Sequence, residues 1–213
     1  ANKIYKAFRY KSGSLSHYYI KNDRIKNFSI SSFETSDPTS ITNDASYHIR
    51  KISTHDFKNS KLQVHFIPKK TKRYFINRYS NHPTYKYDFW GIYDSNSLVS
   101  SFISRTIVIE THTIIRIVDW MGEFTSNLYN EIQELLQNNR AEYIDMLCYI
   151  PDEQQVLGMG FSKKHGKDVI PNYFEPFNKS NVDIKFAYKT RTHRYSFFKG
   201  DSDQDRPNIF GSK

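Results

Sequence analysis

Thr113-Ile-Ile-Arg-Ile-Val-Asp-Trp120 is the segment from which the architecture of this chain can be worked out, because it reads as a strand. The next apolar residues recur at helical spacing and predict a helix between Ser126 and Gln137, with Thr125 or Ser126 as its N-cap. Its buried face would consist of Leu128, Ile132, Leu135 and Leu136. The apolar run Tyr143-Ile-Asp-Met-Leu-Cys-Tyr-Ile150 then predicts a buried strand. A strand, a helix and a strand therefore form the expected centre of the fold.

Further elements are predicted upstream of this centre. Asp88-Phe-Trp-Gly-Ile-Tyr93 and the run from Leu98 to Ile109 flank the turn residues Asp94-Ser-Asn-Ser97, which predicts a β-hairpin. Aromatic residues at helical spacing between Lys70 and Tyr79 predict a helix, and Pro83 ends the pattern.

Downstream of the centre the chain is expected to turn back twice. Pro151 and the two acids that follow it favour the start of a short helix that ends at Gly158. Gly160-Phe161 begins the return. Two last strands are expected over residues 172–177 and 182–188.

The composition limits the class of protein. The 213 residues carry 31 Lys and Arg against 22 Asp and Glu, and the 16 Tyr, 16 Phe and 2 Trp can bury too much area for a disordered chain. No apolar run approaches the ~20 residues of a membrane-spanning helix, and Ala1-Asn-Lys-Ile-Tyr5 lacks the apolar run of a secretory signal. The single cysteine, Cys148, excludes an intrachain disulfide and sits in an apolar strand, where a thiol behaves as a small hydrophobe. We therefore expect a cytoplasmic protein.

The net charge of +9 raises the question of a nucleic-acid partner. The basic residues form three modest clusters rather than one tail, which favours solvated faces. The clusters are Lys69, Lys70, Lys72 and Arg73; Lys163, Lys164, His165 and Lys167; and Lys189, Arg191, His193 and Arg194. We do not expect nucleic acid to be the partner.

The order of predicted elements resembles that of the GNAT acyltransferase superfamily over residues 49–190. The sharpest local match is Leu157-Gly158-Met159-Gly160-Phe161, which is similar to the family's helix-to-strand junction ending in Gly-Phe. The resemblance implies an α/β fold with a mixed, mostly antiparallel sheet flanked by helices. A strand-rich extension over residues 1–48 would precede this domain, and a polar tail over residues 191–213 would pack on it.

A narrower resemblance is to GNAT-like proteins encoded with surface-polysaccharide genes. The segments that carry it are Arg78-Tyr79-x-x-His82-Pro83-x-Tyr85-x-Tyr87, Ile117-Val118-Asp119-Trp120-x-Gly122, Glu142-Tyr143-x-Asp145, Pro171-Asn172-Tyr173-Phe174-Glu175-Pro176-Phe177 and Gly200-Asp201-x-Asp203-Gln204-Asp205-Arg206-Pro207-Asn208. It implies an acyltransferase that moves an acyl group from acetyl-CoA or another acyl-CoA to a small polar acceptor, such as an amino sugar or a nucleotide sugar.

The resemblance also implies where the donor would bind. In the family, the strand before the main helix splays from its neighbour and pairs with the pantetheine arm, and the following turn presents N–H groups to the pyrophosphate. This assigns donor binding to Val118, Trp120, Gly122, Thr125 and Ser126. The pattern departs from the family's Gln/Arg-x-x-Gly-x-Gly/Ala: Asp119 holds the first position and Phe124 the last, and Val156 stands where a Tyr general acid is common. Asp119 and Glu123 add negative charge, which repels a pyrophosphate.

These departures leave three interpretations. The chain binds acyl-CoA in a modified way, with Lys163, Lys164 or Lys167 reaching the phosphates. It uses another donor, as the Fem-type transferases use aminoacyl-tRNA. Or it has lost catalysis and keeps only a binding cleft.

Two carboxylates are candidates for the general base of acyl transfer. Asp119 ends a central strand where the sheet opens toward a ligand, and Glu123 follows it closely, so either could take the acceptor's proton directly or through a water. The alternative for Asp119 is a cap of the next helix.

Other polar residues are candidates for acceptor binding. Asp145 lies inside an apolar strand and must be paired, either with a residue such as Arg116 or with a substrate. Glu175 belongs to one of the segments that carry the narrower resemblance.

The tail contributes the last candidates. Phe197-Phe198 and Ile209-Phe210 can anchor it on the sheet, which would hold Asp203, Asp205 and Arg206 near the cleft to bind hydroxyl groups. We do not expect a metal site, because Arg206 replaces the glycine of a calcium loop and no His pair has zinc-ligand spacing.

Overall fold

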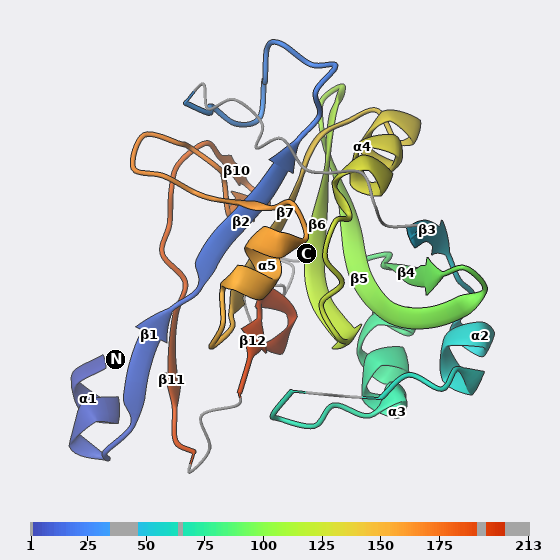
Figure 1. The fold of residues 1–213 in the computed structure, drawn as a ribbon. Coiled ribbons are helices and arrows are strands. Elements are labelled where there is room, and N and C mark those ends of the chain that lie inside the picture. The colour runs from blue at the N-terminus through green and yellow to red at the C-terminus, as the bar shows by residue number, and fades with distance from the viewer. Residues whose placement is uncertain (1, 35–46, 64–65, 191–194, 203–213) are drawn as a thin grey trace.

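A mixed, mostly antiparallel sheet organises the computed structural model, which describes residues 2–34, 47–63, 66–190 and 195–202 (Figure 1). Within these residues the sheet has eight strands in the order β3-β4-β5-β6-β7-β2-β8, with β12 paired to β7. This is the α/β class that the sequence predicts. No helix among the described residues is long and apolar enough to cross a membrane.

The bounds of the elements are as follows. The sheet consists of β2 (Ser16–Lys21), β3 (Tyr47–Lys51), β4 (Asp88–Asp94), β5 (Ser97–Ile109), β6 (His112–Gly122), β7 (Ala141–Tyr149), β8 (Ser162–Lys163) and β12 (Phe197–Phe198). The α-helices are α1 (Asn2–Ala7), α2 (Thr54–Asn59), α3 (Lys72–Phe75), α4 (Tyr129–Asn138) and α5 (Gln154–Gly158). A π-helix η1 (Ile76–Ser80) continues α3, and a 3-10 turn η2 (Lys199–Asp201) follows β12. Outside the sheet lie the antiparallel pairs β1 (Lys11–Ser14) with β11 (Lys185–Tyr188) and β9 (Tyr173–Phe174) with β10 (Phe177–Asn178).

The centre of the sheet follows the sequence prediction. β4 and β5 form the predicted hairpin, and β5 pairs antiparallel with β6. β6 and β7 are parallel neighbours joined through α4, so the predicted strand, helix and strand are confirmed. A predicted helix also starts at Lys72 and ends, as the π-turn η1, before Pro83.

Strands form in both of the last predicted segments, but they lie outside the main sheet. Residues 173–178 form a small hairpin in which β9 and β10 have two residues each, and β11 pairs with β1. β2 lies beside β7 instead. Its residues 17–20 are buried in succession, as in a strand covered on both faces, whereas β11 is exposed or half-buried throughout. The division of the chain at residue 48 stays a prediction; β2 lies inside the same sheet as the later strands.

Each face of the sheet carries its own apolar core. On one face, Trp90, Ile117 and Met146 pack with α4 and α5 in the largest cluster. On the other face, a second cluster beneath α2, α3 and η1 includes Phe57, Phe75, Tyr79, Ile103 and Val118. A third cluster on that face joins Tyr19, Ile30, Tyr143, Ile170 and Phe174. In Figure 1, α1 and the β1–β11 pair project from this body at the lower left.

Helix α4 is confirmed with a later start than the sequence predicts. It spans Tyr129–Asn138 and buries the apolar face, with Leu128 at its N-cap. Thr125 and Ser126 are not the cap, because Asn127 adopts a left-handed φ of 59° and delays the helix to Tyr129. The N–H groups of Asn127 and Leu128 donate to the carbonyls of Gly158 and Met159, which stabilises this entry in place of a side-chain cap.

Replacing Ile132 with Val should lower the free energy of unfolding by about 0.5–1.5 kcal/mol, because Ile132 is 2% exposed at the centre of the α4 interface. Chemical denaturation with a fluorescence readout would measure the loss. Val108→Ala is the matched control: Val108 is 59% exposed and its truncation should change stability by less than about 0.5 kcal/mol. Equal losses in the two variants would contradict the packing described for α4.

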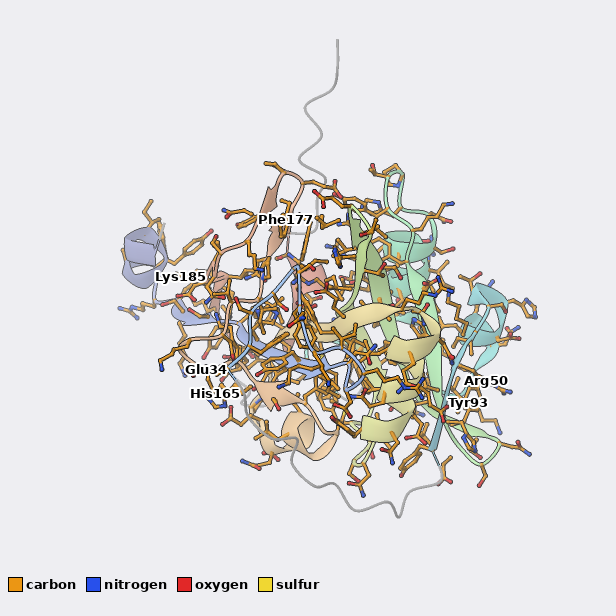
Figure 2. The ribbon with its side chains drawn as sticks, turned by 90° about the horizontal axis from the view of Figure 1, so that it is seen from above. Glu34, Arg50, Tyr93, His165, Phe177 and Lys185 are labelled. Carbon is orange, nitrogen blue, oxygen red and sulfur yellow. The ribbon has the colours of Figure 1, made fainter. Side chains whose placement is uncertain are left out.

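The two ends of the sheet lie on opposite sides of the molecule in Figure 2, where Arg50 of β3 is labelled on one side and His165, which follows β8, on the other. At the β3 edge the guanidinium of Arg50 lies 4.0 Å from the ring centre of Tyr93, and Figure 2 shows His165 and Glu34 near each other on the opposite side of the molecule. Of the three basic clusters, the first lies just before and within α3 and the second at and after β8, so they belong to different elements of the fold. Arg191, His193 and Arg194 lie outside the described residues.

Candidate functional site

Strands β6 and β7 diverge at one end. Their parallel pairing runs from Thr113 opposite Ala141 to Ile117 opposite Met146. Beyond that point β6 continues to Gly122 and β7 to Tyr149 without pairing to each other. The two strands therefore open a gap in the sheet, at the place where the sequence predicts the donor's arm.

The chain's own C-terminal segment, residues 197–201, fills this gap. β12 pairs antiparallel with β7, Phe197 opposite Tyr149 and Phe198 opposite Cys148. Gly200 lies against β6, because a Cβ built on it would be 2.7 Å from the carbonyl oxygen of Val118. Of the two predicted anchors of the tail, Phe197-Phe198 lies on the sheet, with Phe198 buried in the largest core cluster, and Ile209-Phe210 lies outside the described residues.

A buried polar cluster holds the segment in place. Lys70 Nζ donates to Asp119 and also to Asp201, at 3.0 and 3.1 Å from the two oxygens of Asp201. Tyr79 Oη donates to Asp119 Oδ2 at 2.8 Å, and Tyr74 Oη donates to Asp201 Oδ1 at 3.3 Å. Asp119 is fully buried and Lys70 is 6% exposed, so this cluster is part of the interior.

The protonation of this cluster reflects its burial. Desolvation raises the pKa of Asp119 to about 6, although the ammonium group of Lys70 opposes the shift. Desolvation also raises the pKa of Tyr79 well above its usual range, so its hydroxyl stays a donor. Asp119 also accepts the N–H of Trp120 at 2.9 Å. Asp119 is therefore surrounded by groups of the chain itself, and its role as general base stays a prediction.

Asp145 lies on the same face of the sheet but in a different cluster. Arg116 Nε and Nη2 donate to its two oxygens at 2.9 and 2.5 Å, and His17 Nε2 lies 2.8 Å from Oδ2. Burial alone would raise the pKa of Asp145, but Arg116 and His17 outweigh it and hold the pKa at about 2. The sequence predicts that Asp145 is paired either with a residue such as Arg116 or with a substrate. In the structure Arg116 is its partner.

Glu175 lies at the surface, away from both clusters. It accepts from Tyr85 Oη at 2.7 Å and forms an ion pair with Arg105, whose guanidinium lies 3.4 Å from the ring centre of Tyr85. Asp203, Asp205 and Arg206 lie outside the described residues. Among the described residues no group of three or more His, Cys, Asp or Glu side chains is placed to hold a metal ion.

The loop between β6 and α4 is closely packed against its neighbours. Gly122 is left-handed, with φ of 99°, but the space a Cβ would take is filled by Val99 and Ser100 rather than left for a ligand. Phe124 packs on Trp120, with ring centres 5.0 Å apart. Glu123 and Ser126 are exposed, Thr125 is buried, and the N–H groups of Asn127 and Leu128 already have backbone acceptors. The expected donor residues follow one another along β6 and the loop after it, and their binding of a pyrophosphate stays a prediction.

A cavity of about 620 Å³ lies at the mouth of the filled gap. Its walls are Phe66, Glu123, Phe124, Ile150, Pro151, Asp152 and Gln155. The rings of Phe66 and Phe124 are 5.2 Å apart, and each lies within 6.5 Å of the ring of Phe198 in β12. The cavity therefore combines aromatic faces with two carboxylates and an amide.

Several of these residues escape sequence reasoning. The sequence pattern places Lys70 in a solvated basic cluster, whereas in the structure its side chain is buried against Asp119 and Asp201, 49 and 131 positions later in the chain. No sequence pattern identifies Phe66 and Gln155 as site residues, because local periodicity does not indicate which side chains meet at the end of a gap.

Comparison with known proteins gives likeness of fold only. No family model and no curated protein matches the chain. A GCN5-related N-acetyltransferase from Anabaena variabilis ATCC 29413 is similar at 15% identity and a TM-score of 0.47, over 78% of this chain and 42% of that one. A functionally unknown conserved protein from Staphylococcus epidermidis ATCC 12228 is similar at 13% identity and a TM-score of 0.44, over 76% of this chain and 62% of that one. The chain thus spans less than two thirds of the length of each of these proteins.

Proposed function

We propose that this chain binds an amino sugar in the cavity lined by Phe66, Phe124, Glu123 and Asp152, and that it is a binding protein on an acyltransferase-type fold. The observation that carries the proposal is the composition of the cavity. Aromatic faces suit the apolar face of a sugar ring and attract an ammonium group. Two carboxylates and an amide suit hydroxyl and ammonium donors.

The negative charge of the cavity favours an amino sugar over a nucleotide sugar. The phosphates of a nucleotide sugar would lie near the carboxylates of Glu123 and Asp152. A free amino sugar, or an amino-sugar residue of a saccharide, brings a positive charge to the same place. The volume of about 620 Å³ is within the usual range for a small-molecule site.

Titration calorimetry with glucosamine tests this proposal. We expect glucosamine to bind, and glucose and N-acetylglucosamine to bind about 10-fold or more weakly, because they lack the ammonium group. Asp152→Asn should weaken glucosamine binding by about 10-fold to 100-fold and leave glucose binding nearly unchanged. Glu134→Gln, an exposed position on α4, is the matched control. Equal affinity for glucose and glucosamine, or no heat at millimolar glucosamine, would contradict the proposal.

An acyltransferase is the second candidate. The observation that favours it is the divergence of parallel β6 and β7 beside α4. Incubating the protein with glucosamine and acetyl-CoA, and measuring released CoA thiol, separates the two. Binding of glucosamine without thiol release is the result expected here, and thiol release above the protein-free rate would favour the acyltransferase.

A further inference from the structure

We propose that residues 197–201 are a permanent occupant of the gap between β6 and β7, a built-in strand in the place of a donor's arm, so that this chain binds no acyl-CoA there. The inference does not depend on the amino-sugar proposal, since it concerns the strand edges and not the cavity.

The first support is the pairing of the exposed edge. Divergence from β6 leaves the backbone groups of β7 at Cys148 and Tyr149 without a parallel neighbour. β12 pairs with both positions, so the edge to which an extended ligand would add is already used. The residue before β12 is anchored too, because Ser196 N donates to the carbonyl of Ile67 at 2.9 Å.

The second support is the depth at which the segment is packed. Phe198 is 1% exposed and Lys199 is 2% exposed, values of the protein interior. Gly200 fits only because it has no side chain: its Cβ would lie 2.1 Å from Tyr79 Oη and 2.7 Å from the Val118 carbonyl oxygen.

The third support is the set of polar contacts that would be lost if residues 197–201 left the gap between β6 and β7. Asp201 joins Lys70 and Tyr74, and its Oδ2 also accepts the N–H of Phe198 at 3.0 Å. Arg78 Nη2 donates to the carbonyl of Ser202 at 3.1 Å. Removing the segment would leave Lys70 and Asp119 facing an emptied interior, which is costly for buried charges.

Hydrogen exchange of the full chain, read by mass spectrometry, tests the inference directly. We expect the amides of residues 197–201 to exchange as slowly as those of β7, roughly 100-fold or more slower than in an unstructured peptide, with or without millimolar acetyl-CoA. Calorimetry with desulfo-CoA should show no binding heat. Exchange of the segment at unstructured rates, or a binding heat together with faster exchange of residues 197–201, would overturn the inference.

Two variants check that the segment is held by the contacts described. Gly200→Ala should speed exchange at residues 197–201 by roughly 10-fold or more, because the new methyl group has no room. Gly166→Ala is the matched control, since a Cβ there meets nothing within 4 Å. If Gly200→Ala does not fold, Asp201→Asn provides the same readout with a smaller change. Unchanged exchange in both Gly200→Ala and Asp201→Asn would contradict the role of these contacts. The glucosamine titration is a separate readout, so failure of either proposal can be told from failure of the other.

Discussion

Replacing Arg116 with Met is expected to lower the free energy of unfolding by about 3–5 kcal/mol, because it leaves a buried carboxylate without its main partner. The guanidinium is 1% exposed and donates to Asp145, to the carbonyl of Pro171 at 2.7 Å and to the carbonyl of Asn172 at 3.3 Å. Urea denaturation at neutral pH would measure the loss. Lys163→Met, which breaks the exposed pair with Glu153, should cost less than about 1 kcal/mol and is the control.

The pH dependence of this loss follows from the pKa of Asp145. In the native chain the pKa is held at about 2, below the unfolded value near 3.8, so its contribution is present above pH 4 and is lost as the pH falls toward 2. Without Arg116, burial raises the pKa of Asp145, and the variant loses stability as the pH rises through that value. The difference between the two proteins should therefore be larger at pH 8 than at pH 4. A difference that does not change with pH would mean that Arg116 stabilises by packing alone.

Replacing Lys70 with Met should also cost about 3–5 kcal/mol, since Asp119 and Asp201 would then face each other in the interior without a cation. The control is Lys69→Met at the neighbouring exposed position, which should change stability by less than about 0.5 kcal/mol. Thermal denaturation followed by circular dichroism would compare them. Similar melting temperatures of the two variants would contradict the buried cluster.

The sign of the pH effect is opposite to that for Asp145 in the native chain. The pKa of Asp119 is about 6, above its unfolded value near 3.8, so its contribution is largest below pH 4 and declines as the pH rises toward 6. The positive charge of Lys70 lowers the pKa of Asp119, so the pKa of Asp119 should be higher still in the Lys70→Met variant. The free energy of unfolding of this variant should therefore fall further below that of the native chain as the pH is raised from 5 to 8.

The local elements of this fold could be read from the sequence. The spacing of Leu128, Ile132 and Leu135 predicts α4, and the apolar run after Tyr143 predicts β7, because both depend on which residues a helix or a strand places on one face. The hairpin of β4 and β5 depends on a short turn between two runs. The sequence also predicts that Asp145 has a polar partner, since a carboxylate in an apolar strand requires one.

The tertiary structure alone decided which segments meet across long stretches of chain. β2 pairs with β7 from more than 120 positions away, and β12 enters the gap that β6 and β7 leave. Nothing local distinguishes Lys70 from its exposed neighbour Lys69; its burial depends on Asp119 and Asp201, which only the folded sheet brings to it. The helix and strand periods are properties of the chain itself, whereas the filled gap and the charges around it arise from packing distant segments against each other. For that physical reason the sequence predicted a donor cleft, and the folded chain places its own strand there.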